Sequence, residues 1–331
     1  SGGRHLLFAG HTDVVPPGDG AAWTHSPFGA EIVGGRLYGR GAADMKSGVA
    51  AFIAACAAAI ADGRADNGRI SLAITNDEEA DAVNGTEKLL AWAAHQGHVF
   101  DFCIVGEPSA RETVGDSIKI GRRGSFSGRI SVRGTQGHVA YPERARNPIP
   151  ALAAVVSALA GPLDSGNARF PPSNLEFTSV DVGNETSNVI PAAATARFNV
   201  RFNDDWDPDS LEAHLRERLR SVAETDPALA GTVVTLERIA RPANSFLSPE
   251  GDAGALLCDT IARKAGSRPE LSTVGGTSDA RFVAAYCPVV EFGLPGPTMH
   301  KVDEHVTIAD VERLTELYAD FIGAYLGGAS G

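Results

Sequence analysis

Continuous apolar runs recur along the chain and are separated by stretches with helical spacing of apolar positions. A strand buried on both faces of a parallel sheet has such an uninterrupted apolar sequence. The predicted strands are 6–9, 70–75, 102–105 and 289–292. The predicted helices are 46–61, 85–95 and about 308–325, the last with Thr307 and Asp310 as a capping-box-like start. This alternation predicts an α/β fold with a doubly wound catalytic domain.

The middle of the chain has a different pattern. In "SFSGRISVRG", at 125–134, apolar and polar residues alternate, which predicts a half-exposed strand. The elements expected after it are a helix at 149–159, strands at 174–182 and 192–201, a helix at 210–223 and a strand at 232–238. The order β-α-β-β-α-β is typical of a small α+β sandwich. We therefore expect an inserted lid or dimerisation domain at 123–238, which splits the catalytic domain into 1–122 and 239–331.

Composition narrows the class of protein. With 331 residues, 43% of them hydrophobic, the chain exceeds what one core usually supports, so two domains are expected. The net charge of −12 argues against a nucleic-acid partner. The Ala-rich stretch 49–61 is too short to span a bilayer. The 4 cysteines are scattered without CxxC spacing, which indicates buried thiols in a reducing compartment, the cytoplasm. No signal-peptide pattern is visible, but the chain opens on a predicted central strand, so a natural N-terminal segment is expected to be missing.

Polar residues with metal-binding side chains follow the predicted parallel strands. These residues are His11 with Asp13, Asp77 to Glu79, Glu107 and, after a loop, His300, and they are joined by Asp44 at the start of a helix. Ligands bind beyond the carboxyl ends of the strands in open α/β sheets. So many acids would repel one another unless cations lay among them. Histidines mixed with carboxylates fit zinc, with manganese or cobalt as substitutes, and there are enough ligands for two ions.

Each of these residues also has a plainer interpretation. Asp44 could be a helix N-cap, and Glu78 and Glu79 ordinary acids near a helix start. His11 could be a hydrogen-bonded histidine at a strand end, and Glu107 a turn residue. Coincidence at four strand ends is much less expected than one shared site. A dinucleotide site at "GRGAAD" is disfavoured because its third glycine is missing. Structural or surface roles are expected for His95, His98, His214, His305, Met45 and Met299.

Several motifs together resemble the M20 family of dinuclear zinc amidohydrolases. They are "GHTDVVP", "GRGAADMKSG", "NDEEA", "VGEPS", "GRRGS", "GHVAYP", "SNVIPA", "GGTSDARF" and "TMHKVDE". Within that family, "GRRGS", "GHVAYP" and "GGTSDARF" favour the hydrolases of succinylated amino acids over acetylornithine deacetylases, aminoacylases and carboxypeptidases. The resemblance covers nearly the whole chain. It implies an enzyme that cleaves the linear amide of an acyl-amino acid.

The resemblance also implies roles for the candidate residues. Asp44 is expected to bridge two zinc ions, with His11 and Glu107 completing one site and Glu79 and His300 the other. Asp13 is expected to fix the tautomer of His11, and Glu78 to act as general base. The peptide bond after Asp44 is expected to be cis.

The inserted domain is expected to complete the site across a homodimer. His138 and Asn188 would reach into the partner subunit's site, whereas the plainer interpretation of His138 is a loop histidine packed on Tyr141. The residues expected to bind substrate are Arg122, Arg201, Arg281, Ser125, Tyr141, Gly276 and Thr277, with the arginines gripping carboxylates. As an alternative, Arg123 and Arg281 make only ion pairs with neighbouring residues.

Some positions depart from the family pattern. Ala80 and Ser47 replace glycines behind the ligands, and Gly296 replaces an asparagine that contacts substrate in some relatives. Family members also have a helix and strands before "GHTD", so the chain is expected to be a fragment. Two alternatives therefore stay open: a related deacylase or dipeptidase with another acyl-amino acid substrate, and a non-catalytic relative that binds a metal or a peptide.

Overall fold

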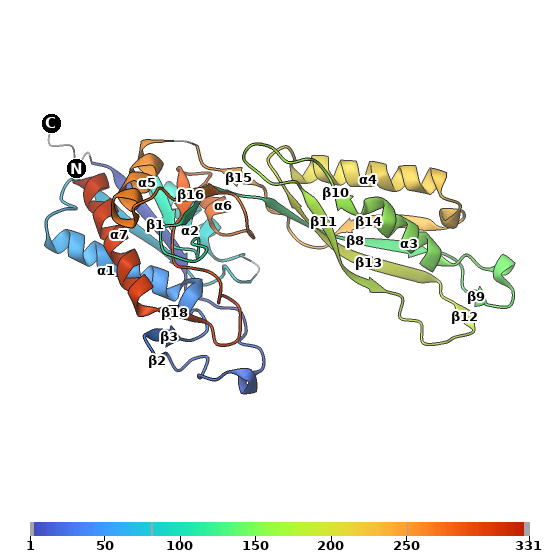
Figure 1. Ribbon diagram of the computed structural model, residues 1–331. Coiled ribbons are helices and arrows are strands. Elements are labelled where there is room, and N and C mark those ends of the chain that lie inside the picture. Colours follow the sequence, from blue (N-terminus) through green and yellow to red (C-terminus); the bar gives the residue numbers. More distant parts are fainter. Residues whose placement is uncertain (1–2, 81, 250, 328–331) are drawn as a thin grey trace. The chain divides into compact units, whose positions relative to one another are not determined.

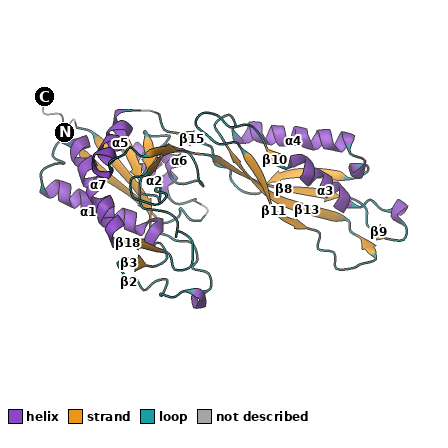
Figure 2. Cartoon of the chain, viewed as in Figure 1, coloured by secondary structure: helices purple, strands orange, loops and turns teal. Residues whose placement is uncertain are grey.

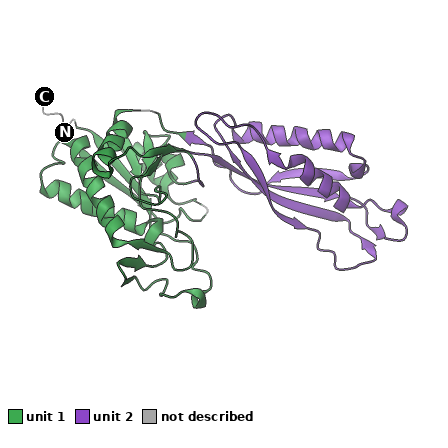
Figure 3. Cartoon of the chain, in the orientation of Figure 1, with its two compact units in different colours: residues 1–121, 247–273, 278–331 green, residues 122–246, 274–277 purple. Residues whose placement is uncertain are grey.

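The computed structural model describes residues 3–80, 82–249 and 251–327. The chain forms two compact units, which Figure 3 colours separately. Unit 1 contains 1–121, 247–273 and 278–331, and unit 2 contains 122–246 and 274–277. Unit 2 continues beyond 238, the boundary expected from the sequence. The reason is that the segment 239–243 is hydrogen-bonded to the strand Gly124–Arg133: Ile239 N donates to Ser127 O at 3.1 Å, and Ala243 N donates to Ser125 O at 2.9 Å.

A six-stranded sheet forms the centre of unit 1, and all four predicted apolar strands belong to it (Figure 1). Its order is β16 (Glu270–Ser272), β6 (Ser117–Lys119), β17 (Val289–Glu291), β5 (Phe102–Val105), β1 (His5–His11) and β4 (Arg69–Thr75). The strands run parallel except at the junction of β17 with β6, which is antiparallel. The carboxyl ends of β1, β4 and β5 therefore lie at one edge of the sheet.

Helices cover the sheet on both faces, as the predicted doubly wound layout requires. They are α1 (Ser47–Ala61), α2 (Thr86–His95), α5 (Asp252–Ala265), α6 (Ala280–Val283) and α7 (Ile308–Leu326). Buried residues of α1, α5 and α7 share one core cluster with Phe8 and Ile104. The intervening residues of these strands point to the other face, and α2 and α6 pack against each other and against β4 and β17. The capping-box-like start is confirmed, because Thr307 Oγ1 accepts the Asp310 N–H at 3.0 Å.

Strand β4 differs from the expectation that it is covered on both faces. It is an edge strand, paired with β1 alone in this sheet. Leu72 is 46% exposed and Ile74 37% exposed. The continuous apolar run predicted the strand correctly, but it could not distinguish an edge strand from a central one.

Helix α1 is the most apolar helix of unit 1. Among the described residues, the segment Ala42–Ala61 is long and apolar enough to cross a membrane, and 61% of its most apolar window is buried in the fold. Its continuous α-helical part is Ser47–Ala61, because Asp44 and Met45 have non-helical backbone angles. The core helix of a soluble domain has the same properties, so the segment is weak evidence for a membrane span.

Two smaller sheets were not predicted. The first pairs β2 (Glu31–Val33), β3 (Arg36–Tyr38) and β18 (His305–Thr307), and the second pairs β7 (Gly121–Arg122) with β15 (Phe246–Leu247), where the chain passes between the units. Strands of two or three residues are too short to show a period in the sequence. The β2–β3–β18 sheet anchors the end of the loop that carries His300.

Unit 2 has the predicted β-α-β-β-α-β order (Figure 2). Its elements are β8 (Gly124–Arg133), β9 (Gly137–His138), α3 (Pro148–Leu159), β10 (Gly161–Pro162), β11 (Asn174–Asp181), β12 (Val189–Ile190), β13 (Ala193–Phe202), α4 (Pro208–Thr225) and β14 (Val233–Arg238). The antiparallel sheet β10-β11-β13-β8-β14 packs its apolar face on α3 and α4 around Phe126, Phe198 and Leu215. Helix α4 begins two residues before the predicted position because Asp207 and Ser210 form a capping box.

Candidate metal centre

Six of the predicted side chains meet at the carboxyl edge of the unit 1 sheet. His11 is the last residue of β1, and Glu107 lies two residues beyond β5. Glu78 and Glu79 lie in the turn after β4, Asp44 in the helical turn Ala42–Lys46 before α1, and His300 in the loop before β18. Close packing of α1 requires a glycine at position 48, because an added Cβ would lie 2.6 Å from the carbonyl oxygen of Gly106.

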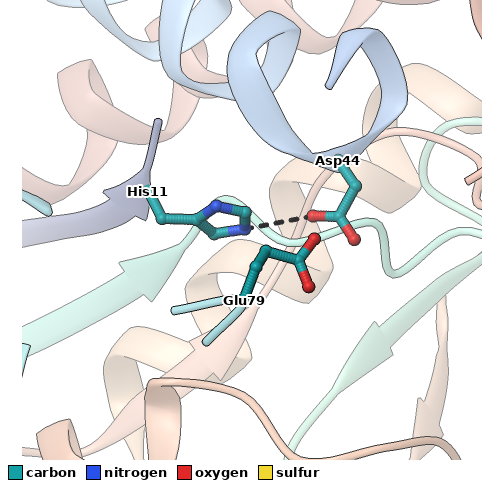
Figure 4. A group of neighbouring side chains, drawn as sticks. All are labelled: His11, Asp44 and Glu79. Carbon is teal, nitrogen blue, oxygen red and sulfur yellow. Dashed lines mark hydrogen bonds and ion pairs between the residues drawn. The ribbon is translucent and has the colours of Figure 1, made fainter. Parts of the chain in front are cut away.

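Asp44 lies between the two histidines. Its Oδ1 is 3.2 Å from Nε2 of His11, and its Oδ2 is 3.2 Å from Nε2 of His300. Figure 4 shows the His11 ring directed at the Asp44 carboxylate, with the Glu79 carboxylate beside it. The peptide bond between Asp44 and Met45 is cis, as the resemblance implied. Each carboxylate oxygen of Asp44 thus faces a different imidazole, which is the arrangement that a bridging ligand needs.

Asp13 contacts Nδ1 of the His11 ring through its backbone carbonyl, whereas a contact through its side chain was expected. Nδ1 of His11 is 3.0 Å from the backbone carbonyl oxygen of Asp13, whereas the Asp13 carboxylate is 3.5 Å away. An Nδ1–H that donates to this carbonyl leaves Nε2 free to bind a metal. The Asp13 carboxylate instead accepts the Glu79 N–H through Oδ2 at 3.0 Å. Asp13 therefore connects two of the candidate ligands.

The remaining acids complete two overlapping groups. Nε2 of His300 is 2.9 Å from Oε1 of Glu79, and Nε2 of His11 is 3.6 Å from Glu107 and 4.0 Å from Glu78. One candidate ligand group is His11, Asp44 and Glu79, and the other is His11, Glu78 and Glu107. His11 and Glu79 share the first group, whereas the resemblance assigns them to different ions.

Electrostatic interactions in this cluster favour positive charge. Burial opposes protonation of His11, but the hydrogen bond and charge of Asp44 outweigh it and raise the pKa of His11 to about 9. The hydrogen bond with Asp44 likewise raises the pKa of His300 to about 9. Burial raises the pKa of Glu78 to about 8. The two imidazolium ions hold the pKa of Asp44 well below its usual range, against the effect of burial.

Two buried acids near the cluster were missed by the sequence interpretation. Oδ2 of Asp279 accepts a 2.5 Å hydrogen bond from Thr86, and its Oδ1 has no hydrogen-bond partner among the described residues. Glu304 has no exposed surface and pairs with Arg40. Both acids lie inside quoted motifs, "GGTSDARF" and "TMHKVDE", and this position in a motif was the available signal.

The predicted partner-reaching residues lie together in unit 2. His138 pairs with Val189 across β9 and β12, and Val139 N donates to the carbonyl of Asn188 at 3.1 Å. His138 and Tyr141 are both exposed, and their ring centroids are 5.9 Å apart. The plainer interpretation of His138, packing on Tyr141, therefore describes a real contact, but it leaves the imidazole accessible.

Five of the seven predicted substrate-binding residues form two sets in unit 2. Ser125 and Arg201 are directly opposite each other on β8 and β13. Arg122 packs on Gly275, where an added Cβ would lie 2.1 Å from Nη1, and Gly275 precedes Gly276 and Thr277.

The expectation of simple ion pairs for the other two arginines fails for Arg123. This residue donates to the neutral oxygens of Pro172 and Asn174. Arg281, in unit 1, lies over the ring of Phe282 at 4.5 Å from the centroid.

Comparison with known sequences identifies relatives along nearly the whole chain. The model of peptidase family M20/M25/M40 matches residues 7–324. Succinyl-diaminopimelate desuccinylase of Methylocella silvestris is 55% identical over 326 residues, which cover 98% of this chain and 83% of that protein. The enzyme of the same name from Methylorubrum extorquens is 54% identical over 327 residues, with the same coverage.

Solved structures with the same fold are much more distant in sequence. An M20 family metallo-carboxypeptidase from Sulfolobus solfataricus has a TM-score of 0.77 at 17% identity and covers 98% of this chain and 85% of its own. Aminopeptidase PepT from Bacillus cereus has a TM-score of 0.76 at 19% identity, with coverage of 98% and 81%. At this identity the likeness establishes the fold alone.

Proposed function

The chain belongs to peptidase family M20/M25/M40, and from this premise we propose that it hydrolyses N-succinyl-LL-2,6-diaminopimelate to succinate and LL-2,6-diaminopimelate. Relatives that are 54–55% identical over 98% of the chain carry the name of that activity. The observation that carries the proposal is the six-residue cluster, which has the ligand types of a hydrolytic metal site. We propose two zinc ions per subunit, with cobalt or manganese as possible substitutes.

The donor set fits divalent ions. Two imidazoles and four carboxylates crowd together, and the raised pKa values of His11 and His300 mark a site where positive charge is stabilised. We assign Asp44 as the bridging ligand, His11 and Glu107 to one ion, and Glu79 and His300 to the other. The two oxygens of Asp44, each 3.2 Å from a different imidazole, support this assignment.

Glu78 is the proposed general base. Bound divalent ions make water more acidic and withdraw electron density from a carbonyl oxygen. Glu78 accepts a proton from the attacking water and passes it to the nitrogen of the breaking C–N bond. The succinyl carbon gains the hydroxyl group, and the amine leaves. Burial raises the pKa of Glu78, and a divalent ion beside it would oppose this rise and favour the carboxylate form that accepts a proton.

A substrate panel tests the assignment. Zinc-loaded protein is assayed with N-succinyl-LL-diaminopimelate, N-acetylornithine and a dipeptide, and kcat/KM is compared. We expect the succinylated substrate to be preferred by at least about 100-fold, because the proposed arginines can bind the free carboxylate of its succinyl group, which an acetyl group lacks. Equal or better turnover of acetylornithine or the dipeptide would assign the chain to another activity in the family. Turnover of none of the three by protein that binds zinc would favour a non-catalytic relative.

Unit 2 is proposed to supply substrate contacts and the dimer interface. We assign Arg122 and Arg201 to the substrate carboxylates, since guanidinium groups bind them in bidentate geometry. The proposed hydrogen-bonding residues are Ser125, Tyr141, Gly276 and Thr277. His138 and Asn188 are proposed to complete the site of the partner subunit in a homodimer, and their adjacent, accessible positions support a joint role.

Subunit complementation tests this shared site. His138→Ala and Glu78→Gln proteins are each expected to be nearly inactive. If the partner supplies His138, a 1:1 mixture regains about a quarter of wild-type activity, because half of the randomly exchanged dimers contain one intact site. Activity that stays at the level of the separate variants after proven subunit exchange would place His138 outside the partner's site.

We propose that the enzyme works in the cytoplasm. The four cysteines are free and buried, as they are in proteins of reducing compartments. Cell fractionation with an antibody against the protein tests the location, and recovery outside the cytoplasmic fraction would contradict it.

A further inference from the structure

The loop that carries His300 and the turn that carries Asp44 are anchored by the same buried ion pair. Arg40 follows β3, and Glu304 directly precedes β18, the strand paired with β3. Arg40 is 6% exposed and Glu304 is 0% exposed, and Nη1 of Arg40 contacts Oε2 of Glu304. The Arg40 guanidinium also lies over the Trp23 ring, 5.2 Å from its centroid. The pair is thus almost completely shielded from water.

The second oxygen of Glu304 holds the backbone of the proposed bridging ligand. Oε1 accepts the N–H of Ala43 at 2.9 Å and the N–H of Asp44 at 3.1 Å. These bonds fix the turn from which the Asp44 carboxylate projects. Charge-assisted hydrogen bonds of this kind are roughly twice as strong as neutral ones.

Glu304 also forms the base of the His300 loop. The loop is closed by hydrogen bonds between Thr298 and His305, where Thr298 Oγ1 donates to the His305 carbonyl at 2.7 Å. His300 has a left-handed φ of 61°, and its side chain is 44% exposed. An exposed imidazole is not held by packing, so its position depends on the loop backbone. Glu304, four residues away, connects that backbone to Asp44.

From these contacts we propose that Arg40 and Glu304 are a positioning pair that couples His300 to Asp44 and thereby sets the affinity for the ion assigned to Asp44, Glu79 and His300. This inference rests on the proposed metal site. The ion assigned to His11 and Glu107 depends less on the pair, because β1 and β5 position those ligands directly. Loss of the pair should therefore weaken one ion more than the other.

We compare wild type with four variants by three measurements: zinc affinity by titration calorimetry, metal content after gel filtration, and Tm by thermal unfolding. Glu304→Ala removes the acceptor of both N–H groups and leaves Arg40 unpaired. Glu304→Gln keeps an acceptor at Oε1 and should rescue part of the affinity. The double variant Arg40→Met/Glu304→Met removes both charges together, which often preserves stability. Asp164→Asn in unit 2 is the matched control, since it alters a hydrogen-bonded carboxylate away from the cluster.

We expect Glu304→Ala and the double variant to bind the zinc ion assigned to Asp44, Glu79 and His300 about 10- to 100-fold less tightly, the size typical of losing a partner that orients a ligand. Metal content should fall from two ions towards one, and the double variant should keep this defect even where its Tm matches wild type. The Asp164→Asn control should bind zinc as wild type does. Wild-type affinity for both ions in the double variant would overturn the inference, as would a change in Tm alone in Glu304→Ala.

Failure of the underlying metal site has a different signature. If wild type binds no zinc, the proposed function and the positioning role fall together. If wild type and all variants bind two ions equally, the positioning role alone is wrong. Zinc binding that is weakened as expected, in a protein that does not hydrolyse the succinylated substrate, supports the positioning role and contradicts the proposed function.

Discussion

Partly or fully buried carboxylates occur in both units, and their surroundings are opposite. In unit 2, Asp164 is surrounded by neutral donors: Oδ1 accepts from Gly166 N at 2.8 Å, Ser173 N at 2.9 Å and Asn203 Nδ2 at 3.0 Å, and Oδ2 accepts from Trp206 Nε1 at 2.8 Å. In unit 1, the carboxylates of the cluster face one another and two imidazoles.

The pKa shifts follow this difference. For Asp164, burial acts to raise the pKa, but hydrogen bonds from Ser173, Trp206 and Gly166 outweigh it and lower the pKa. For Glu78, burial raises the pKa to about 8, and the charges of neighbouring acids add to the rise. Hydrogen bonds from neutral donors favour the ionised form of a carboxylate, so such a group stabilises the fold when it is deprotonated. Carboxylates gathered without enough donors destabilise one another, and we interpret the unit 1 cluster as a site built for cations.

The largest expected effect is on catalysis. Glu78→Gln removes the proposed base and keeps the size of the side chain, so kcat should fall by about 10³-fold or more. Zinc content should stay at the wild-type value, since Glu78 is not assigned as a ligand. Steady-state kinetics and metal analysis on the same preparation check both statements. Residual kcat above a tenth of wild type would assign the base role elsewhere.

The second largest effect is expected on stability, where removal of metal by a chelator should affect unit 1 and not unit 2. Removing divalent ions should abolish activity and lower the stability of unit 1 by about 2.7 kcal/mol relative to protein at a free zinc concentration 100 times Kd. Unit 2 should be unaffected, because its carboxylates are satisfied without metal. Hydrogen exchange measured with and without chelator checks this by peptide. Equal loss of protection in both units would contradict the comparison.

Asp164→Ala should lower the stability of unit 2 and leave the metal centre of unit 1 unchanged, which is the reverse of the effect of chelation. It leaves the donors of Gly166, Ser173, Asn203 and Trp206 without their acceptor, so the free energy of unfolding should fall by about 2 kcal/mol. Zinc affinity should not change. Urea unfolding and zinc titration measure the two quantities, and a loss of zinc affinity at unchanged stability would show that unit 2 takes part in metal binding.

The smallest effect concerns pH. The pKa of Asp164 is lower in the folded protein than its ordinary value, so its stabilising contribution is present above about pH 4 and is lost as pH falls through the folded pKa. The stability difference between wild type and Asp164→Asn should therefore shrink as pH falls from 6 to about 3. Urea unfolding over this range measures it. A difference that grows at low pH would mean that the pKa is raised.

The sequence predicted most of the cluster because its members lie close to recognisable elements. His11, Glu79 and Glu107 come within four residues of the ends of apolar strands, and parallel strands bring their carboxyl ends to one edge. The apolar pattern also predicted the unit 2 elements, whose alternation is regular over ten residues in β8. The apolar pattern therefore predicted both the main secondary-structure elements and the place where the cluster lies.

Other features depend on contacts that no local pattern records. Glu304 acts on a residue 260 positions away in the chain, and its place in the motif "TMHKVDE" does not show that it is buried against Arg40 or bonded to that residue. Strands β3 and β18 have three residues each, too few for a period. Helix α5 was not predicted, although it ends at Gly266 in the left-handed region with basic residues in its last turn. Those end signals were present and were overlooked.

The central claim is that the six-residue cluster binds two divalent ions. Crystals of zinc-loaded wild-type protein, measured at the zinc absorption edge, test it most directly. We expect two anomalous peaks in each subunit, one on either side of the Asp44 carboxylate. Zinc-saturated crystals without a peak among these six side chains, or with zinc bound elsewhere in the chain, would contradict it.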